Sequence, residues 1–222
     1  MKTLKNKPTA IRGLYAITPD TADTDQLCAL VEASLQGGAS LLQYRNKTAN
    51  HALRVAQSRA LLELCRDYGV PLIINDNIKL CLAIDADGVH LGTSDGNLAE
   101  SRARLGPEKI LGASCYNRYE LAIEAKLRGA DYVAFGACFA SATKPNARKA
   151  DLALFGKAHA DLGLPSVAIG GISQDNAMLA INAGADAVAV IAALYSAPDV
   201  TLAAQQFSNL FTQPSIQTEQ TI

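Results

Sequence analysis

The sequence predicts an α/β protein built as a single (β/α)8 barrel, the TIM barrel. Eight short apolar runs rich in β-branched residues recur along the 222 residues, at 13–18, 40–45, 71–75, 87–91, 109–114, 131–136, 165–170 and 186–191. Longer Ala/Leu-rich stretches with helical spacing separate them, for example at 25–36, 49–68 and 118–128. This alternation implies a parallel sheet, because parallel neighbours need a crossover connection. Eight units in a chain of this length fit a closed barrel.

Glycine-containing turns support the same architecture. Gly37-Gly38-Ala39, Gly129-Ala130-Asp131 and Gly184-Ala185-Asp186 each stand between a predicted helix and the following strand, where glycine can close the helix. The alternative is an open, doubly wound sheet, which usually carries a glycine-rich fingerprint after its first strand. Residues 13–20 have none. We therefore expect one domain over residues 1–222, with flexible tails at 1–11 and 213–222.

The amino-acid composition limits the classes of binding partner that we expect. The 20 basic and 21 acidic residues give a net charge of −1, which gives no reason to expect nucleic acid or an anionic membrane as a partner. Every apolar run is too short to span a bilayer, and residues 1–10 lack a signal-peptide core, so we expect a cytoplasmic protein. The five cysteines, without a C-x-x-C pair, indicate reduced thiols. Small-molecule substrates are the expected partners, and a homo-oligomer stays open.

The end of the second predicted strand carries two cations. Its sequence is Gln43-Tyr44-Arg45-Asn46-Lys47. Because side chains alternate along a strand, Gln43, Arg45 and Lys47 share one face, while Leu42 and Tyr44 share the helix-packed face. Two cations side by side favour an anion such as a diphosphate between them. The alternative is the start of a solvated loop.

Two aspartates follow the third and fourth predicted strands. Asp76 comes after Ile73-Ile74-Asn75, and Asp95 lies in Leu91-Gly92-Thr93-Ser94-Asp95-Gly96. Each could simply cap the next helix, and for Asp76 alone the cap is the favoured interpretation. Carboxylates on adjacent strand loops could also share a Mg²⁺ ion that binds substrate phosphates. A magnesium site therefore stays open beside the helix caps.

The later strand ends suggest a second anion site. Ser114 ends the fifth strand and could bind a ligand or cap a helix, and the loop after the sixth contains Ser141, Thr143 and Lys144. Gly170-Gly171 ends the seventh strand, where barrels often bind phosphate through backbone amides. His90 lies inside a predicted strand, where a structural role is favoured over a catalytic one.

Taken in order, these segments resemble the thiamine-phosphate synthase (thiamine-phosphate pyrophosphorylase) family. The resemblance covers about residues 12–193 and rests on Gly-Leu-Tyr-Ala-Ile-Thr at 13–18, Gln-Tyr-Arg-Asn-Lys at 43–47, Ile-Asn-Asp at 74–76, Ala-Asp-Gly-Val-His-Leu-Gly at 86–92, Gly-Ala-Ser at 112–114 and Ala-Ile-Gly-Gly-Ile at 168–172. It implies a transferase of thiamine biosynthesis. Such an enzyme condenses hydroxymethylpyrimidine diphosphate with hydroxyethylthiazole phosphate, giving thiamine phosphate and pyrophosphate.

The resemblance also implies roles for individual residues. Pyrophosphate would leave first, assisted by Mg²⁺, and the thiazole nitrogen would attack the resulting pyrimidine cation. The implied catalytic residues are Arg45, Lys47, Ser114 and Lys144. The implied pyrimidine diphosphate site is Gln43, Tyr44, Arg45, Asn46, Lys47, Asn75, Ser114 and Lys144. The implied thiazole phosphate site is Ser141, Ala142, Thr143, Gly171, Ile191 and Ala192, and the implied Mg²⁺ ligands are Asp76 and Asp95.

Three residues depart from the usual family pattern. Asn46 replaces an acid, Ser141 replaces a threonine, and Ala192 replaces a serine. Two rival functions stay open: a thiazole tautomerase of the same superfamily, and a non-catalytic barrel that binds phosphorylated ligands. The tautomerase has little reason to keep both aspartates together with the cations. Mg²⁺-dependent release of pyrophosphate on mixing both substrates would exclude both rivals.

Overall fold

Eight parallel strands close into a barrel, as the alternation of strands and helices predicts. The structure is a computed structural model that describes residues 11–140 and 149–212. The strands pair in sequence order around the barrel, with β1 against β8 closing it. They are β1 (Gly13–Ile17), β2 (Leu41–Tyr44), β3 (Leu72–Asn75), β4 (Gly88–Leu91), β5 (Ile110–Tyr116), β6 (Tyr132–Phe135), β7 (Ser166–Ile169) and β8 (Ala187–Val190).

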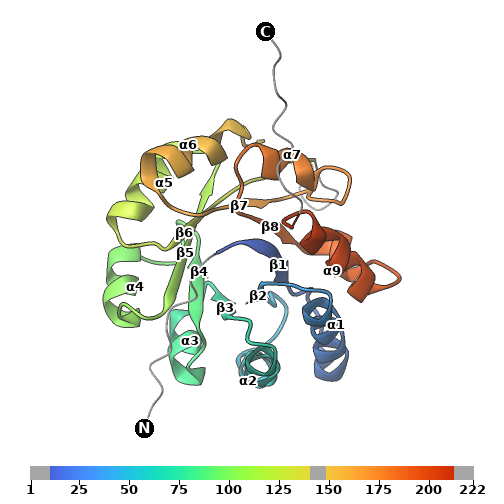
Figure 1. Cartoon of the computed structure of the whole chain (residues 1–222). Coiled ribbons are helices and arrows are strands. Elements are labelled where there is room, and N and C mark those ends of the chain that lie inside the picture. Colours follow the sequence, from blue (N-terminus) through green and yellow to red (C-terminus); the bar gives the residue numbers. More distant parts are fainter. Residues whose placement is uncertain (1–10, 141–148, 213–222) are drawn as a thin grey trace.

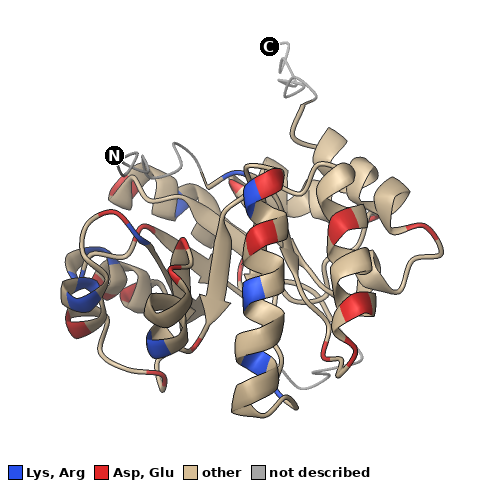
Figure 2. Cartoon of the chain, turned by 90° about the horizontal axis from the view of Figure 1, so that it is seen from below, with Lys and Arg blue, Asp and Glu red and all other residues tan. Residues whose placement is uncertain are grey.

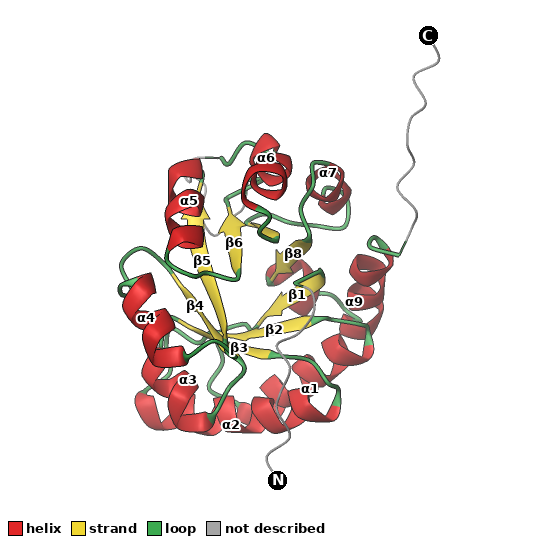
Figure 3. Cartoon of the chain, turned by 60° about the vertical axis from the view of Figure 1, so that its left-hand side comes forward, coloured by secondary structure: helices red, strands yellow, loops and turns green. Residues whose placement is uncertain are grey.

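The helices form a ring around the strands (Figures 1 and 3). The described helices are α1 (Thr24–Gln36), α2 (His51–Asp67), α3 (Ile78–Ile84), α4 (Leu98–Leu105), α5 (Tyr119–Leu127), α6 (Ala153–Leu162), α7 (Ala177–Asn182), α8 (Ala192–Tyr195) and α9 (Val200–Asn209). The helix α2, in front in Figure 2, carries both basic and acidic residues along its length. In 11–140 and 149–212, no helix has the length and apolarity that a membrane span needs.

Alternation along the strands divides the core into two layers. Leu42, Tyr44 and Ile74 belong to the large apolar layer between the strands and the helices. Tyr15 and Tyr132 belong to a smaller cluster inside the barrel. The face predicted for Leu42 and Tyr44 is therefore confirmed, and the even-odd alternation decides which side chains reach the barrel interior.

The structure describes only one residue of the expected tails, Ile11. Residues 1–10 and 213–222 lie outside the described part of the chain. Ile11 was expected in the first tail, but it is buried in the cluster inside the barrel. An apolar side chain just before β1 fills the end of the barrel opposite the strand carboxyl ends, so the assignment of Ile11 to a tail was wrong.

Candidate active site at the carboxyl ends of the strands

The loop after β1 fixes the cationic loop after β2. The Thr18 hydroxyl accepts a hydrogen bond from the Arg45 amide at 2.9 Å and donates to the Arg45 carbonyl at 2.8 Å. Asp20 Oδ1 accepts from the Lys47 amide at 2.8 Å and lies 3.5 Å from the Arg45 guanidinium. Arg45 and Lys47 are thereby held at the carboxyl edge of the sheet. Asp20 is also a carboxylate that a bound anion would have to replace beside Arg45.

Two other residues of this motif, Tyr44 and Asn46, are hydrogen-bonded to α2. The Tyr44 hydroxyl donates to Gln57 Oε1 at 2.9 Å. The Asn46 amide group donates to the same oxygen at 3.0 Å and to the Thr21 carbonyl at 2.7 Å, while Asn46 Oδ1 accepts from the Ala49 amide at 3.0 Å. Both side chains therefore serve the connection between β2 and α2. An acid at position 46 would lack the two hydrogens that Asn46 donates.

Asp76 and Asp95 come together, and neither caps a helix. The caps are the residues Asn77 for α3 and Asn97 for α4, whose side chains accept from the Leu80 amide and from the Ala99 and Glu100 amides. The capping interpretation of both aspartates was therefore wrong. Each helix begins one or two residues later than that interpretation requires. Both carboxylates remain available for another role.

The local backbone holds the two aspartates in place. Asp76 has a φ of 59°, a left-handed conformation that aspartate adopts more readily than most residues, and its amide donates to the His90 carbonyl at 2.8 Å. Asp95 Oδ2 accepts from the Gly92 amide at 2.9 Å. The Asn75 amide group donates to Asp76 Oδ2 at 2.6 Å. The β3 and β4 loops are thus fastened to each other next to the two carboxylates.

The two carboxylates affect each other electrostatically. The pKa of Asp76 is raised to about 6 by partial burial, then by the negative charge of Asp95 and a hydrogen bond with it. Asn75 and the positive charge of Lys47 lower it in part. No group of three or more His, Cys, Asp or Glu side chains suited to a metal occurs among the described residues. A cation here would have two carboxylates and would need its other ligands from substrate or water.

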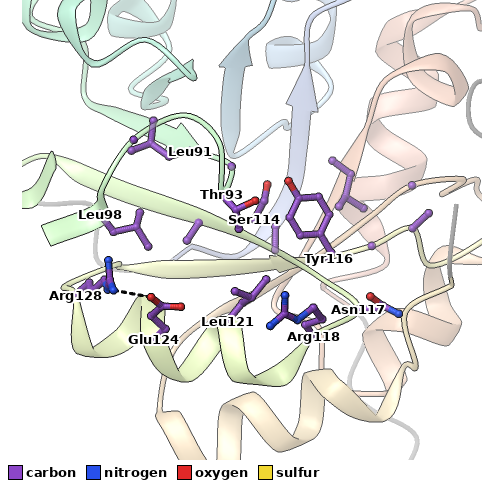
Figure 4. Close-up of a pocket in the computed structure, with 18 residues that line it drawn as sticks. Leu91, Thr93, Leu98, Ser114, Tyr116, Asn117, Arg118, Leu121, Glu124 and Arg128 are labelled. Atoms are coloured by element: carbon purple, nitrogen blue, oxygen red, sulfur yellow. Dashed lines mark ion pairs between the residues drawn. The ribbon is translucent and has the colours of Figure 1, made fainter. Parts of the chain in front are cut away.

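Two cavities open at this end of the barrel. A cavity of about 230 Å³ lies between the β2 and β3 loops and α2, and its lining includes Arg45, Lys47, Asn75 and Asp76. A larger cavity of about 900 Å³ spans the ends of β4 to β7 (Figure 4). Of the residues predicted for the pyrimidine diphosphate site, the small cavity is lined by Tyr44, Arg45, Asn46, Lys47 and Asn75, and the large one by Ser114.

The large cavity has a polar end and an apolar side. Ser114 and Thr93 lie near the Tyr116 ring, while Leu98 and Leu121 line the cavity on the side where Arg128 and Glu124 form an ion pair (Figure 4). Ser114 stands within β5 and not at a helix start, since the N-cap position of α5 is Arg118. Its interpretation as a capping serine is therefore wrong. Its hydroxyl faces a space large enough for an aromatic ring.

A glycine with positive φ follows β7, and a short helix follows β8. Gly171 has a φ of 67°, and its carbonyl accepts from the Asn176 side chain at 2.8 Å. Ile191 directly precedes α8, so the first amides of that short helix, at Ala192 and Ala193, begin just after β8. Amides at a helix start have no partner within the helix. Ser141, Ala142, Thr143 and Lys144 lie outside the described residues.

Sequence reasoning missed a chain of polar side chains inside the barrel. Gln43 Nε2 donates to the Tyr15 hydroxyl at 2.9 Å, and this hydroxyl lies 2.8 Å from the Tyr132 hydroxyl. Tyr132 in turn lies 2.9 Å from His90 Nδ1, and His90 Nε2 lies 2.8 Å from Ser114 Oγ. Burial lowers the pKa of His90 to about 4, so the imidazole is neutral at neutral pH. The alternation of β1 and β6 places both tyrosines inside and could have indicated them, but not their contact.

Comparisons with known proteins show the family of the chain. Residues 14–194 match the family described as thiamine monophosphate synthase. A thiamine-phosphate synthase of Methylobacillus flagellatus is 60% identical over 90% of this chain and 96% of its own length. One of Nitrosospira multiformis is 53% identical over 92% of this chain and 88% of its own.

A solved structure gives the same result. The thiamine phosphate pyrophosphorylase of Pyrococcus furiosus superposes with a TM-score of 0.80 at 34% identity, covering 90% of this chain and 95% of that one. The match with the family runs from within β1 to α8 and so includes every strand. The chain belongs to the thiamine monophosphate synthase family.

Proposed function

We propose that this protein condenses hydroxymethylpyrimidine diphosphate with hydroxyethylthiazole phosphate at the carboxyl ends of its strands, releasing pyrophosphate. The observation that carries the assignment of the site is the pair Asp76 and Asp95, which no helix uses, beside the cations Arg45 and Lys47. A bound cation would neutralise the two aspartates, and a bound diphosphate would neutralise Arg45 and Lys47. A tautomerase acting on thiazole phosphate alone would need neither.

The residues present fit a Mg²⁺ ion. Magnesium in phosphate-transfer sites is usually held by one or two carboxylates, with substrate oxygens and water completing its coordination. The proposed ligands are Asp76 and Asp95, whose carboxyl groups are close enough to hydrogen-bond each other. When bound, the ion would supply positive charge to the departing pyrophosphate.

The protein's own contribution is positioning and charge. Arg45 can bind a diphosphate through its planar fork and Lys47 through its ammonium, both on a loop fixed by Thr18 and Asp20. Lys144, outside the described residues, is proposed as a third cation. As the bond to pyrophosphate breaks, negative charge grows on the leaving oxygens, and these cations stabilise it. The pyrimidine cation that remains then reacts with the thiazole nitrogen, without a protein base or nucleophile.

The acceptor's phosphate is proposed to bind at the ends of β7 and β8. Gly171 follows β7, Ile191 and Ala192 follow β8, and Ala192 lacks the usual serine hydroxyl. Backbone amides at a helix start suit phosphate without any side chain. We therefore propose that Ala192 contributes its N–H, and that Ser141, Ala142 and Thr143 complete this site. Holding the thiazole close to the pyrimidine converts the bimolecular condensation into an effectively unimolecular step.

The decisive experiment measures pyrophosphate release on mixing both substrates, with and without Mg²⁺. Release that requires the ion is the expected result, and binding of thiazole phosphate without any release would refute the proposal. The variants Asp76→Asn and Asp95→Asn should then lower turnover sharply while thiazole phosphate affinity stays within about twofold, because the two sites are separate. Equal loss of thiazole phosphate binding would contradict that separation.

A further inference from the structure

Five polar side chains form an unbroken path across the inside of the barrel. The path begins at Gln43 on β2, passes through Tyr15 on β1, Tyr132 on β6 and His90 on β4, and ends at Ser114 on β5. The glycine Gly112 makes room for it, because a Cβ atom there would lie 2.1 Å from Cζ of the Tyr132 ring. The His90 ring also stacks on Tyr132, with ring centroids 5.5 Å apart.

Each hydrogen bond of this path has one donor and one acceptor at a time. Tyr15 and Tyr132 are buried, so the single hydrogen of each hydroxyl needs a partner, and a neutral imidazole has one N–H. The donor at the first link therefore fixes the donor at every later link. Gln43 donates through Nε2 to Tyr15. Tyr15 then donates to Tyr132, and Tyr132 donates to His90 Nδ1. The remaining imidazole hydrogen must therefore be on Nε2, where it points at Ser114 Oγ.

We propose that this path is a directional hydrogen-bond chain in which His90 carries its proton on Nε2 and Ser114 donates its own hydroxyl hydrogen into the large cavity. Tyr15, Tyr132 and His90 are then positioning residues. They make Ser114, which lines the large cavity, a donor toward a ring-nitrogen or oxygen acceptor on the ligand, and they leave the side-chain oxygen Oε1 of Gln43 as the acceptor at the other end of the chain. A ligand with a ring-nitrogen acceptor, such as an aminopyrimidine, matches the Ser114 end of the chain.

The opposite direction would give the opposite chemistry. If Ser114 donated to His90, the imidazole proton would be on Nδ1 and the chain would end by donating to Gln43 Oε1. Ser114 would then offer only an acceptor to the cavity. The tautomer of His90 therefore reports what the two ends of the chain present to a ligand, although three side chains separate them.

The tautomer can be read directly by NMR of the protein with ¹⁵N-labelled histidine, without substrate. The chain has three histidines, and the His90 signals are those that disappear in His90→Asn. The expected result is a proton on Nε2 and none on Nδ1 at neutral pH. A proton on Nδ1, or exchange between the two forms, would overturn the proposal.

One substitution should reverse the chain from its far end. In Gln43→Glu the new carboxylate can only accept, so Tyr15 must donate to it and the His90 proton should move to Nδ1. The same change at another buried glutamine, Gln57→Glu, lies on the α2 side of β2 and should leave the tautomer on Nε2. Adding Tyr132→Phe interrupts the path and should abolish the response to Gln43→Glu. An unchanged tautomer in Gln43→Glu would overturn the directional coupling.

The catalytic consequence rests on the proposed pyrimidine site and is measured separately. Tyr132→Phe should raise the KM for pyrimidine diphosphate about tenfold, which corresponds to one hydrogen bond to the ligand, and leave the KM for thiazole phosphate unchanged. The control Tyr195→Phe removes a buried hydroxyl that lies 3.2 Å from Ser34 and should change neither KM. The expected tautomer together with an unchanged KM would overturn the pyrimidine assignment of Ser114 and not the proposed direction.

Discussion

Replacing Gly171 by alanine should damage both the stability of the barrel and the proposed thiazole phosphate site. The glycine has a φ of 67°, and an added Cβ atom would lie 2.5 Å from the Phe139 carbonyl oxygen and 2.6 Å from that of Ala140. Ordinary contacts begin near 3.4 Å. The loop after β6 or the end of β7 must therefore move by almost 1 Å. Both segments belong to the proposed acceptor site.

The chain offers a matched control for the backbone strain. Gly163, which ends α6, has a φ of 59°, and a Cβ there would meet nothing within 4 Å. Gly163→Ala therefore includes the left-handed strain, about 1–2 kcal/mol, without the clash. Gly171→Ala adds a steric term of about 1–3 kcal/mol. For a domain of this size that difference lowers Tm by a further 2–12 °C or so.

Calorimetry and steady-state kinetics on the two variants test this reasoning. Gly171→Ala should also raise the KM for thiazole phosphate about tenfold or more, because a phosphate hydrogen bond to a displaced amide is weakened. Gly163→Ala should leave that KM unchanged. Equal Tm values for the two variants would refute the steric calculation. Equal KM values would refute the placement of the phosphate beside Gly171.

Three further predictions follow from the loops of the site. Asn46→Asp should lower stability by about 1–3 kcal/mol in thermal unfolding, because a carboxylate cannot donate to the Thr21 carbonyl or to Gln57 Oε1 as Asn46 does; unchanged Tm would contradict this. Mg²⁺ affinity, measured by titration calorimetry, should fall by up to about tenfold per pH unit below 6, because Asp76 must lose its proton to bind the ion. The raised pKa stabilises the metal-free protein below about pH 4, and this contribution should disappear as the pH rises through 6. Asp95→Asn should lower the pKa of Asp76 and so shift the pH dependence of both Mg²⁺ affinity and stability to lower pH. An unmoved midpoint would contradict the electrostatic coupling between the two aspartates. Asp20→Asn should change the KM for pyrimidine diphosphate and leave the KM for thiazole phosphate unchanged, because Asp20 contacts Arg45 and Lys47 of the cationic loop.

The eight strands could be predicted because their signals are local. Alternating apolar residues and glycines at helix ends are properties of short segments, and each predicted strand overlaps an observed one. The same alternation correctly placed Leu42 and Tyr44 on the helix side of β2. The resemblance to the family was likewise a matter of short motifs in a fixed order, and the comparisons confirm it.

The site was only partly predictable, because competing local explanations differ by one residue. Asp76 followed by Asn77 offers two possible caps for the same helix, and the sequence alone favoured the wrong one. The structure selects Asn77, which accepts from the Leu80 amide, and leaves Asp76 in a left-handed conformation beside Asp95. Asn46 shows the same limit, because its hydrogen-bond partner Gln57 lies on α2, a separate element that packs against β2.

By itself, the sequence determined the class of the barrel, the strand ends that carry charge, and the family, because these depend on residue order and on short-range periodicity. Only the tertiary structure decided which polar groups meet. Tyr15 and Tyr132 are 117 residues apart in the chain, and their hydroxyls are 2.8 Å apart in the barrel. Barrel closure and strand register bring such residues together, and neither is a property of any single segment. Contact across the barrel therefore fixes the polar chain that ends at Ser114.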